Sequence, residues 1–220
     1  MNDILSTKIL DLCELEQEGL VELQRDTNLN AELEALGRTG RQSTPAGASL
    51  ALLGLTDLAL RSSAPDLVHR LVAVHCRIGW FLEKVVHAYG WPGADLLGEE
   101  AALAFSAMLA HADDRPSLRQ RAIADALERN GQLRAGIDGR QYGHVVDRNQ
   151  VILEAPQVYG TYLLPKPEGP GLVWPVRDEA QLNTRRKKIR LPPIHHDIEL
   201  YKTGATPGPF LAPVPAAGGR

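Results

Sequence analysis

Apolar side chains recur at every third or fourth position along most of this chain, which is the spacing that buries one face of an α-helix. Glycines and prolines mark the ends of these stretches. The pattern predicts helices over residues 4–36, 50–60, 65–89, 98–112, 116–131, 178–189 and 194–201. We therefore expect a molecule built mainly from packed helices.

The pattern changes after residue 140. Short runs of β-branched and aliphatic residues, separated by Pro, Gly and Asn, occupy residues 145–153, 158–162 and 172–176. Such runs are typical of short strands. We predict an α+β fold, in which a mainly helical orthogonal bundle carries a small antiparallel sheet after residue 140.

The length of 220 residues is enough to bury a substantial core as one domain. We expect residues 65–202 to form this core domain, with an N-terminal helical region and loop in residues 1–64. Residues 203–220 are mostly Gly, Pro and Ala. A segment of this composition buries little apolar surface, so we expect a flexible tail there.

Composition and charge narrow the class of protein. Hydrophobic residues make up 44% of the chain and charged residues 23%, as in ordinary soluble domains. The net charge of −3 argues against a nucleic-acid partner, because such proteins usually present a basic surface. The sequence has no secretory signal pattern and no apolar run near the ~20 residues that span a bilayer. We expect a cytoplasmic protein that does not contact membranes, of undetermined oligomeric state.

His111 is the first candidate for chemistry. It ends the predicted helix 98–112 and shares a face with Ala104 and Met108, so its ring should lie at the inner edge of that helix. The helix dipole favours the charged imidazolium there, whereas burial disfavours it. A histidine under both influences suits general acid–base catalysis near neutral pH. The alternative is a core histidine held by Asp113 or by a backbone carbonyl.

Two further residues complete a predicted catalytic set of His111, Asp113 and Arg148. Asp113 either orients His111, as the third member of a relay would, or caps the next helix. The guanidinium of Arg148 either holds a carboxylate or phosphate of the substrate, or pairs with a neighbouring acid such as Asp147.

Substrate-binding candidates lie on both sides of these residues. Gln157, Tyr159 and Thr161 alternate along a predicted strand, so they would share one face. That face is either a wall for a polar ligand or an ordinary solvated surface. Trp91 either stacks on a substrate or fills the corner between two helices. With Asp147, these residues form the predicted binding set.

A metal site is a weaker hypothesis. The histidines that would have to supply it are His111, His144, His195 and His196. Two His with one carboxylate suit iron, and three His suit zinc. No pair has the HExxH spacing, and no CxxC or glycine-rich nucleotide loop is present. We therefore predict no metal and no other cofactor.

Several short motifs follow one another in a recognisable order: Gly90-Trp91-Pro92, Gly98-Glu99, His111-Ala112-Asp113, Asp147-Arg148, Gln157, Tyr159-Gly160-Thr161 and Arg185-Arg186. On these residues the chain resembles a bacterial family recorded only as a domain of unknown function, over about residues 89–191. It departs from the family pattern at Ala110, Val146, Tyr162 and Arg190. The resemblance places the candidates in one functional cluster and adds Arg186 to the binding set. It implies no reaction.

Two functions are compatible with these residues. The leading hypothesis is an enzyme, hydrolase- or lyase-like, in which His111 exchanges protons with a small polar or anionic substrate, a small molecule or a peptide. The alternative is a non-catalytic binding or protein-interaction module with a buried polar network. Cleavage of RNA or a nucleotide, helped by the basic run at residues 185–188, is a third hypothesis that would require strongly salt-dependent binding.

Overall fold

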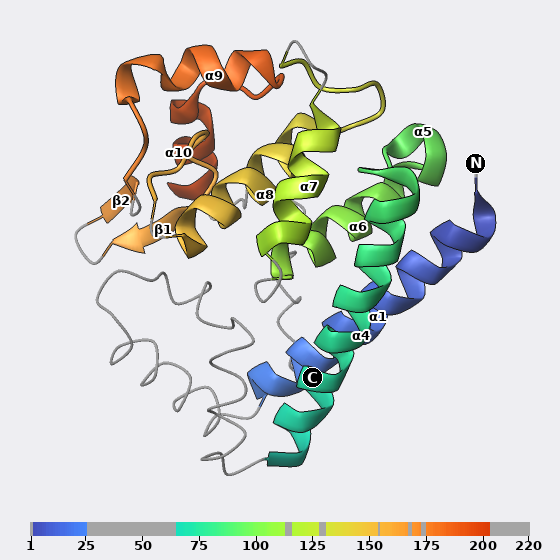
Figure 1. Cartoon of the computed structure of the whole chain (residues 1–220). Coiled ribbons are helices and arrows are strands. Elements are labelled where there is room, and N and C mark those ends of the chain that lie inside the picture. The colour runs from blue at the N-terminus through green and yellow to red at the C-terminus, as the bar shows by residue number, and fades with distance from the viewer. Residues whose placement is uncertain are drawn as a thin grey trace, which may run out of the picture.

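The computed structural model describes residues 2–25, 65–112, 116–127, 131–153, 155–166, 169–172 and 175–202. Most of these residues are helical (Figure 1). The helices are α1 (Asp3–Arg25), α4 (Pro65–Tyr89), α5 (Ala94–Leu97), α6 (Glu99–His111), α7 (Pro116–Ala126), α8 (Gly139–Ile152), α9 (Leu182–Lys188) and α10 (Ile194–Lys202). A 3-10 turn, η1 (Glu179–Gln181), leads into α9.

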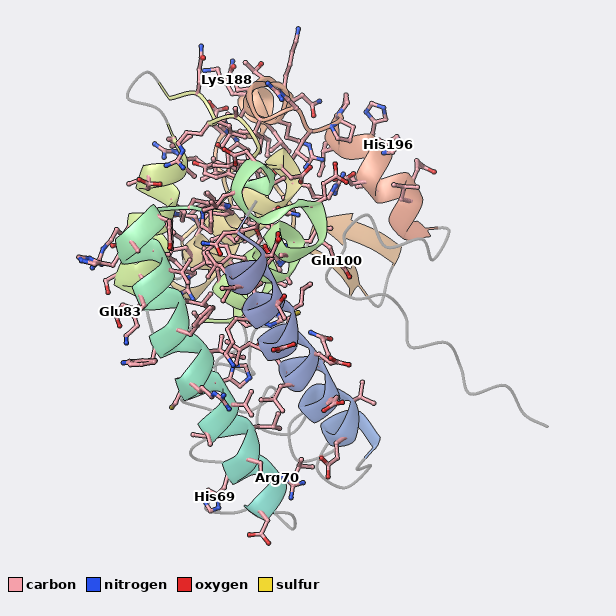
Figure 2. The ribbon with its side chains drawn as sticks, turned by 90° about the vertical axis from the view of Figure 1, so that its right-hand side faces the viewer. His69, Arg70, Glu83, Glu100, Lys188 and His196 are labelled. Carbon is pink, nitrogen blue, oxygen red and sulfur yellow. The ribbon has the colours of Figure 1, made fainter. Side chains whose placement is uncertain are left out.

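The core lies where α6 packs against α1, α4 and α8. The two long helices α1 and α4 run side by side (Figures 1 and 2). α6 is rich in alanine, and its small side chains let neighbouring helices approach closely. Ile9 and Leu12 of α1 belong to the same buried cluster as Phe105 and Met108 of α6. The N-terminal helix therefore shares the core of the segment that follows it.

The predicted α+β class is wrong, because residues 145–152, where the sheet was expected to begin, lie in helix α8. Tyr142, Val145, Val146 and Asn149 are all buried and follow a spacing of three and four, which places them on one helical face. Burial of this face outweighs the weak strand preference of two valines. The sequence signal for a helix was present, but the β-branched residues obscured it.

Strand pairing in the described residues is confined to a short hairpin and isolated bridges. β1 (Leu163–Lys166) pairs antiparallel with β2 (Gly169–Leu172), Leu163 opposite Leu172. One isolated bridge joins Gln157 to Val176 in parallel orientation. No larger sheet is formed by this part of the chain, and the described residues form a helical bundle with one hairpin.

The remaining helices can be compared with the sequence pattern. α4, α6, α7, α9 and α10 match the predicted helices at residues 65–89, 98–112, 116–131, 178–189 and 194–201 to within a few residues. α5 was not predicted. The predicted helix at 50–60, the end of the helix at 4–36 and the tail at 203–220 lie outside the described residues. Among the described helices, none has the length and apolar character needed to cross a membrane.

Candidate functional site

Three helices meet at the carboxylate of Glu16, which is fully buried. Nδ1 of His111, at the end of α6, lies 3.1 Å from Oε1 of Glu16. Nδ1 of His75, from α4, lies 3.6 Å from the same oxygen. The side chain of His111 is 28% exposed and that of His75 is 12% exposed. We call Glu16, His75 and His111 the Glu16 cluster. It connects a buried carboxylate to an imidazole that solvent can reach.

Glu16 lies inside because it occupies a position of the apolar face of α1. Ile9 and Leu12 precede it at intervals of seven and four residues, and both are buried. Gly19 continues this face and lies against Leu71 of α4. Glu16 was not among the residues predicted from the sequence. The signal that could have identified it is a single acidic residue at a position where the helical pattern requires an apolar one.

The Glu16 carboxylate is held in its charged form by the two histidines. Burial raises its pKa, but the charge of His111, the hydrogen bond to His111 and the charge of His75 outweigh burial, so the pKa lies below its ordinary value. Oε2 of Glu16 is buried and has no hydrogen-bond partner among the described residues. An ionised carboxylate only accepts hydrogen bonds, so the ring of His111 presents Nδ1–H to Glu16.

A second group of side chains surrounds His144 on α8. Its Nε2 lies 2.9 Å from the hydroxyl of Tyr162, and the two rings stack with their centroids 4.5 Å apart. Arg148, one helical turn further along α8, lies with its guanidinium 5.9 Å from the centroid of the Tyr162 ring. Burial, followed by the charges of His111, Arg148 and Arg140, lowers the pKa of His144 to about 3. His111 and Arg148 therefore both lie near one neutral imidazole.

Asp147 is completely buried and is surrounded by donors from a single loop. Its Oδ1 accepts hydrogen bonds from the amides of Val158, at 2.7 Å, and Tyr159, at 2.9 Å. Its Oδ2 accepts bonds from both the amide and the hydroxyl of Thr161, at 2.8 Å each. Burial raises the pKa of Asp147 and these hydrogen bonds oppose that rise. Asp147 therefore anchors residues 158–161 to α8.

The predicted strand that would align Gln157, Tyr159 and Thr161 on one face is not formed. The backbone turns at Gly160, whose φ of +64° lies in the left-handed region that favours glycine. The side chain of Gln157 is buried and binds the backbone of Tyr162: Oε1 accepts from its amide at 2.8 Å, and Nε2 donates to its carbonyl at 3.3 Å. Gln157 thus fixes Tyr162 beside His144.

Arg186 is also buried and makes internal hydrogen bonds. It donates to the carbonyl oxygens of Tyr159, at 2.7 Å, and Pro192, at 2.6 Å, and it pairs with Asp197. Asp197 also receives the two nitrogens of the Arg140 guanidinium, at 3.2 Å and 2.9 Å. We call Arg140, Arg186 and Asp197 the Asp197 cluster. It ties α8, α9 and α10 to the loop that carries Tyr159.

Trp91 lies in the core, with 1% of its surface exposed. Its ring makes an edge contact with Phe105, with centroids 6.3 Å apart, and a tilted contact with Tyr142, with centroids 6.0 Å apart. Its amide donates to Asp125 at 2.8 Å. This position corresponds to the packing alternative for Trp91. Asp113, the predicted orienter of His111, lies outside the described residues, and Glu16 is the carboxylate found beside His111.

Two of the four histidines considered as metal ligands, His195 and His196, lie on α10, apart in sequence from His111 on α6 and His144 on α8. His195 and His196 are exposed on α10, and Figure 2 shows His196 pointing outward. In the part of the chain that the structure describes, no group of three or more His, Cys, Asp or Glu side chains is arranged to hold a metal ion.

Comparison with known families identifies one match, over residues 53–205, to a family of unknown function, DUF6624. The chain belongs to this family. The resemblance found in the sequence is thereby confirmed at the level of a domain of unknown function. The bacterial origin and the individual motifs of the DUF6624 resemblance stay predictions. No curated protein and no solved structure matches the chain.

The DUF6624 match includes His75, His111, Arg148 and Tyr162, but it begins after Glu16. The carboxylate that binds His111 is therefore contributed by a segment outside the matched region.

Proposed function

We propose that this chain is an enzyme in which His111 acts as the general acid–base group on a small polar or anionic substrate. The observation that carries the proposal is the 3.1 Å contact between Nδ1 of His111 and the buried, charged Glu16. A buried carboxylate behind a histidine fixes the ring orientation and the tautomer, and it stabilises the imidazolium that forms during proton transfer.

The chemistry follows from which nitrogen Glu16 binds. With Nδ1–H donated to Glu16, Nε2 is the atom that takes a proton from water or from the substrate. The same atom then returns the proton to the leaving group. This sequence suits hydrolysis or elimination. His144 does not compete for the proton, because its pKa lies near 3. Arg148, which is buried beside His144 and Tyr162, is our candidate for anchoring a carboxylate or phosphate of the substrate.

The remaining predicted residues fall into supporting roles in this proposal. The loop 157–162 is held by hydrogen bonds of Asp147, Gln157, Thr161 and Arg186. Trp91 packs in the core against Phe105 and Tyr142. Tyr159 is half-buried and remains a substrate-binding candidate. The role of Asp113 stays a prediction. With a net charge of −3, we propose a small-molecule or peptide substrate in the cytoplasm rather than a nucleic acid.

The alternative is a non-catalytic module in which the polar residues only stabilise the fold. The saturated hydrogen bonding of Asp147 and Arg186 favours this interpretation for those two residues. It does not extend to the Glu16 cluster, where one carboxylate oxygen has no partner among the described residues and the His111 ring is partly exposed.

The test compares the wild-type protein with His111→Gln on a metabolite extract, with mass spectrometry to follow compounds that disappear. We expect the wild type to consume one or more polar or anionic compounds, and His111→Gln to do so at least about 100-fold more slowly, the usual contribution of a general acid–base group. His196→Gln is the matched control, because His196 is 57% exposed on α10. Equal turnover by wild type and His111→Gln would refute the assignment, and loss of folding in His111→Gln would favour a structural histidine.

A further inference from the structure

The Glu16 cluster contains one carboxylate and two imidazoles. His75 and His111 approach the same oxygen, Oε1, from two different helices. Only His111 is within hydrogen-bond distance, at 3.1 Å, whereas His75 is at 3.6 Å and is the less exposed of the two. A single negative charge in a largely apolar interior stabilises one neighbouring positive charge well. A second positive charge at the same oxygen is opposed by repulsion and by burial.

Among the described residues, the charges that act on the Glu16 carboxylate are those of His111 and His75, and no second acid is among them. On α1, the thiol of Cys13 lies near Glu16, and burial followed by the charge of Glu16 raises its pKa to about 11, so it is neutral. On α8, His144 is neutral and close enough for the charge of His111 to act on it. On α7, the buried Arg119 donates to the carbonyl of Ala112, next to His111, and adds positive charge. An ion pair between α1 and α4, Glu22 with Arg70, is exposed.

We propose that His75 is a positioning residue for the acid–base site. It shares Glu16 with His111, so the two imidazoles together carry one positive charge. The charge on one ring then controls how readily the other ring takes up a proton. This inference rests on the proposed function of His111 for its catalytic meaning, but not for its test. Since His111 has the shorter contact and the more exposed ring, it takes the first proton and His75 takes the second only at lower pH.

The coupling has a direct consequence for catalysis. When His75 is protonated, its positive charge interacts with the same carboxylate and makes His111 a weaker base. When His75 is neutral, Glu16 acts on His111 alone. The acidic limb of the activity profile therefore depends on two ionisations instead of one, as expected for coupled titrations.

The test is an NMR titration of the imidazole signals of the full-length protein in wild type, His75→Gln and His111→Gln. Glutamine keeps a hydrogen-bonding side chain but cannot carry charge. Because His111 takes the first proton while His75 is neutral, its titration midpoint should change little in His75→Gln. The midpoint of His75, which titrates when His111 is already charged, should rise by on the order of 1 unit in His111→Gln, the size expected for nearby like charges at an intermediate dielectric.

Two variants control this experiment. His87→Gln removes an exposed histidine from the same helix, α4, and should leave the His75 midpoint unchanged. Glu16→Gln removes the shared anion and should lower the midpoints of both histidines. A His75 midpoint that does not rise in His111→Gln, or a shift found at His111 instead of His75, would overturn the proposal.

Turnover by the same variants separates this inference from the proposed function. If the NMR coupling is present but His111→Gln is fully active, the shared proton exists without a catalytic role, and the positioning role of His75 fails together with the proposed function. If His111→Gln is inactive and the coupling is absent, only the inference about His75 fails.

Discussion

Replacement of Asp197 by asparagine tests the Asp197 cluster, in which two arginines pair with one buried carboxylate. Asp197 is 1% exposed and Arg186 is fully buried, and the two side chains are paired. The other hydrogen bonds of Arg186 go to the carbonyls of Tyr159 and Pro192, so the guanidinium has no route to solvent. Asp197→Asn keeps the size of the side chain and one acceptor oxygen but removes the negative charge.

The expected cost follows from the burial of each partner. Removing one member of a buried pair leaves an uncompensated charge, which typically costs about 3–5 kcal/mol. Arg140 adds little, because its side chain is 24% exposed and can turn to water, and such pairs are worth about 1 kcal/mol or less. We therefore expect Asp197→Asn to lower the free energy of unfolding by about 3–5 kcal/mol, most of it from Arg186.

Urea unfolding followed by far-UV circular dichroism measures this difference, with Asp178→Asn as the control. Asp178 is exposed and has a φ of +43°, a conformation that asparagine also tolerates, so its replacement should change stability by less than about 0.5 kcal/mol. If the loss in Asp197→Asn is no larger than that in Asp178→Asn, the Arg186 pair does not stabilise the fold as argued.

The pH dependence supplies an independent check. Burial raises the pKa of Asp197, but hydrogen bonds from Arg140 and Arg186 and then their charges outweigh it, so the pKa is lowered in the folded protein. A lowered carboxyl pKa contributes stability that is complete above the unfolded value of about 3.9 and is lost as the pH falls through the folded value. The difference between wild type and Asp197→Asn should therefore be constant above about pH 5 and shrink below pH 4. A difference that grows on acidification would contradict this sign.

Two further predictions concern the loop 157–162. Asp147→Asn places an amide nitrogen against N–H and O–H groups that now donate to the carboxylate. Urea unfolding should therefore show a free energy of unfolding lower by about 2–4 kcal/mol, and a variant as stable as wild type would mean that the Asp147 carboxylate does not stabilise the fold. Gly160→Ala should cost about 1–2 kcal/mol in the same assay, because φ is +64° while an added Cβ meets its neighbours at an ordinary 3.5–3.6 Å; no loss would mean that the turn at Gly160 is not needed.

Most helices could be predicted from the spacing of apolar residues, and the one clear failure has a physical cause. Val145, Val146, Val151 and Ile152 are residues that favour strands locally, but α8 is fixed by the burial of Tyr142, Val145, Val146 and Asn149 on one face against α6 and α7. A local preference of a few tenths of a kcal/mol per residue does not compete with the burial of a whole helical face. The information that decided α8 was therefore tertiary.

The candidate site was only partly predictable for a similar reason. His111 and Arg148 could be chosen from their chemistry, and both lie near His144. Glu16 and His75 approach His111 from helices α1 and α4, which are 95 and 36 positions away in the sequence, and no local motif marks such an approach. The partner that was predicted from proximity in sequence, Asp113, lies outside the described residues.

The buried carboxylates Asp147, Asp197 and Glu16 differ in how completely their oxygens are hydrogen-bonded. This difference distinguishes a structural role from a catalytic one. Each oxygen of Asp147 and of Asp197 accepts at least one hydrogen bond. Such carboxylates resist change, because any movement costs several bonds at once. In Glu16, Oε1 faces two titratable side chains, His75 and His111, whereas Oε2 has no hydrogen-bond partner among the described residues. Its charge can be redistributed by moving a single proton. A buried acid whose oxygens are all hydrogen-bonded stabilises a fold, whereas an acid bound to titratable groups is suited to proton transfer. For this reason we propose the acid–base site at Glu16 and His111 rather than at Asp147, which accepts more hydrogen bonds.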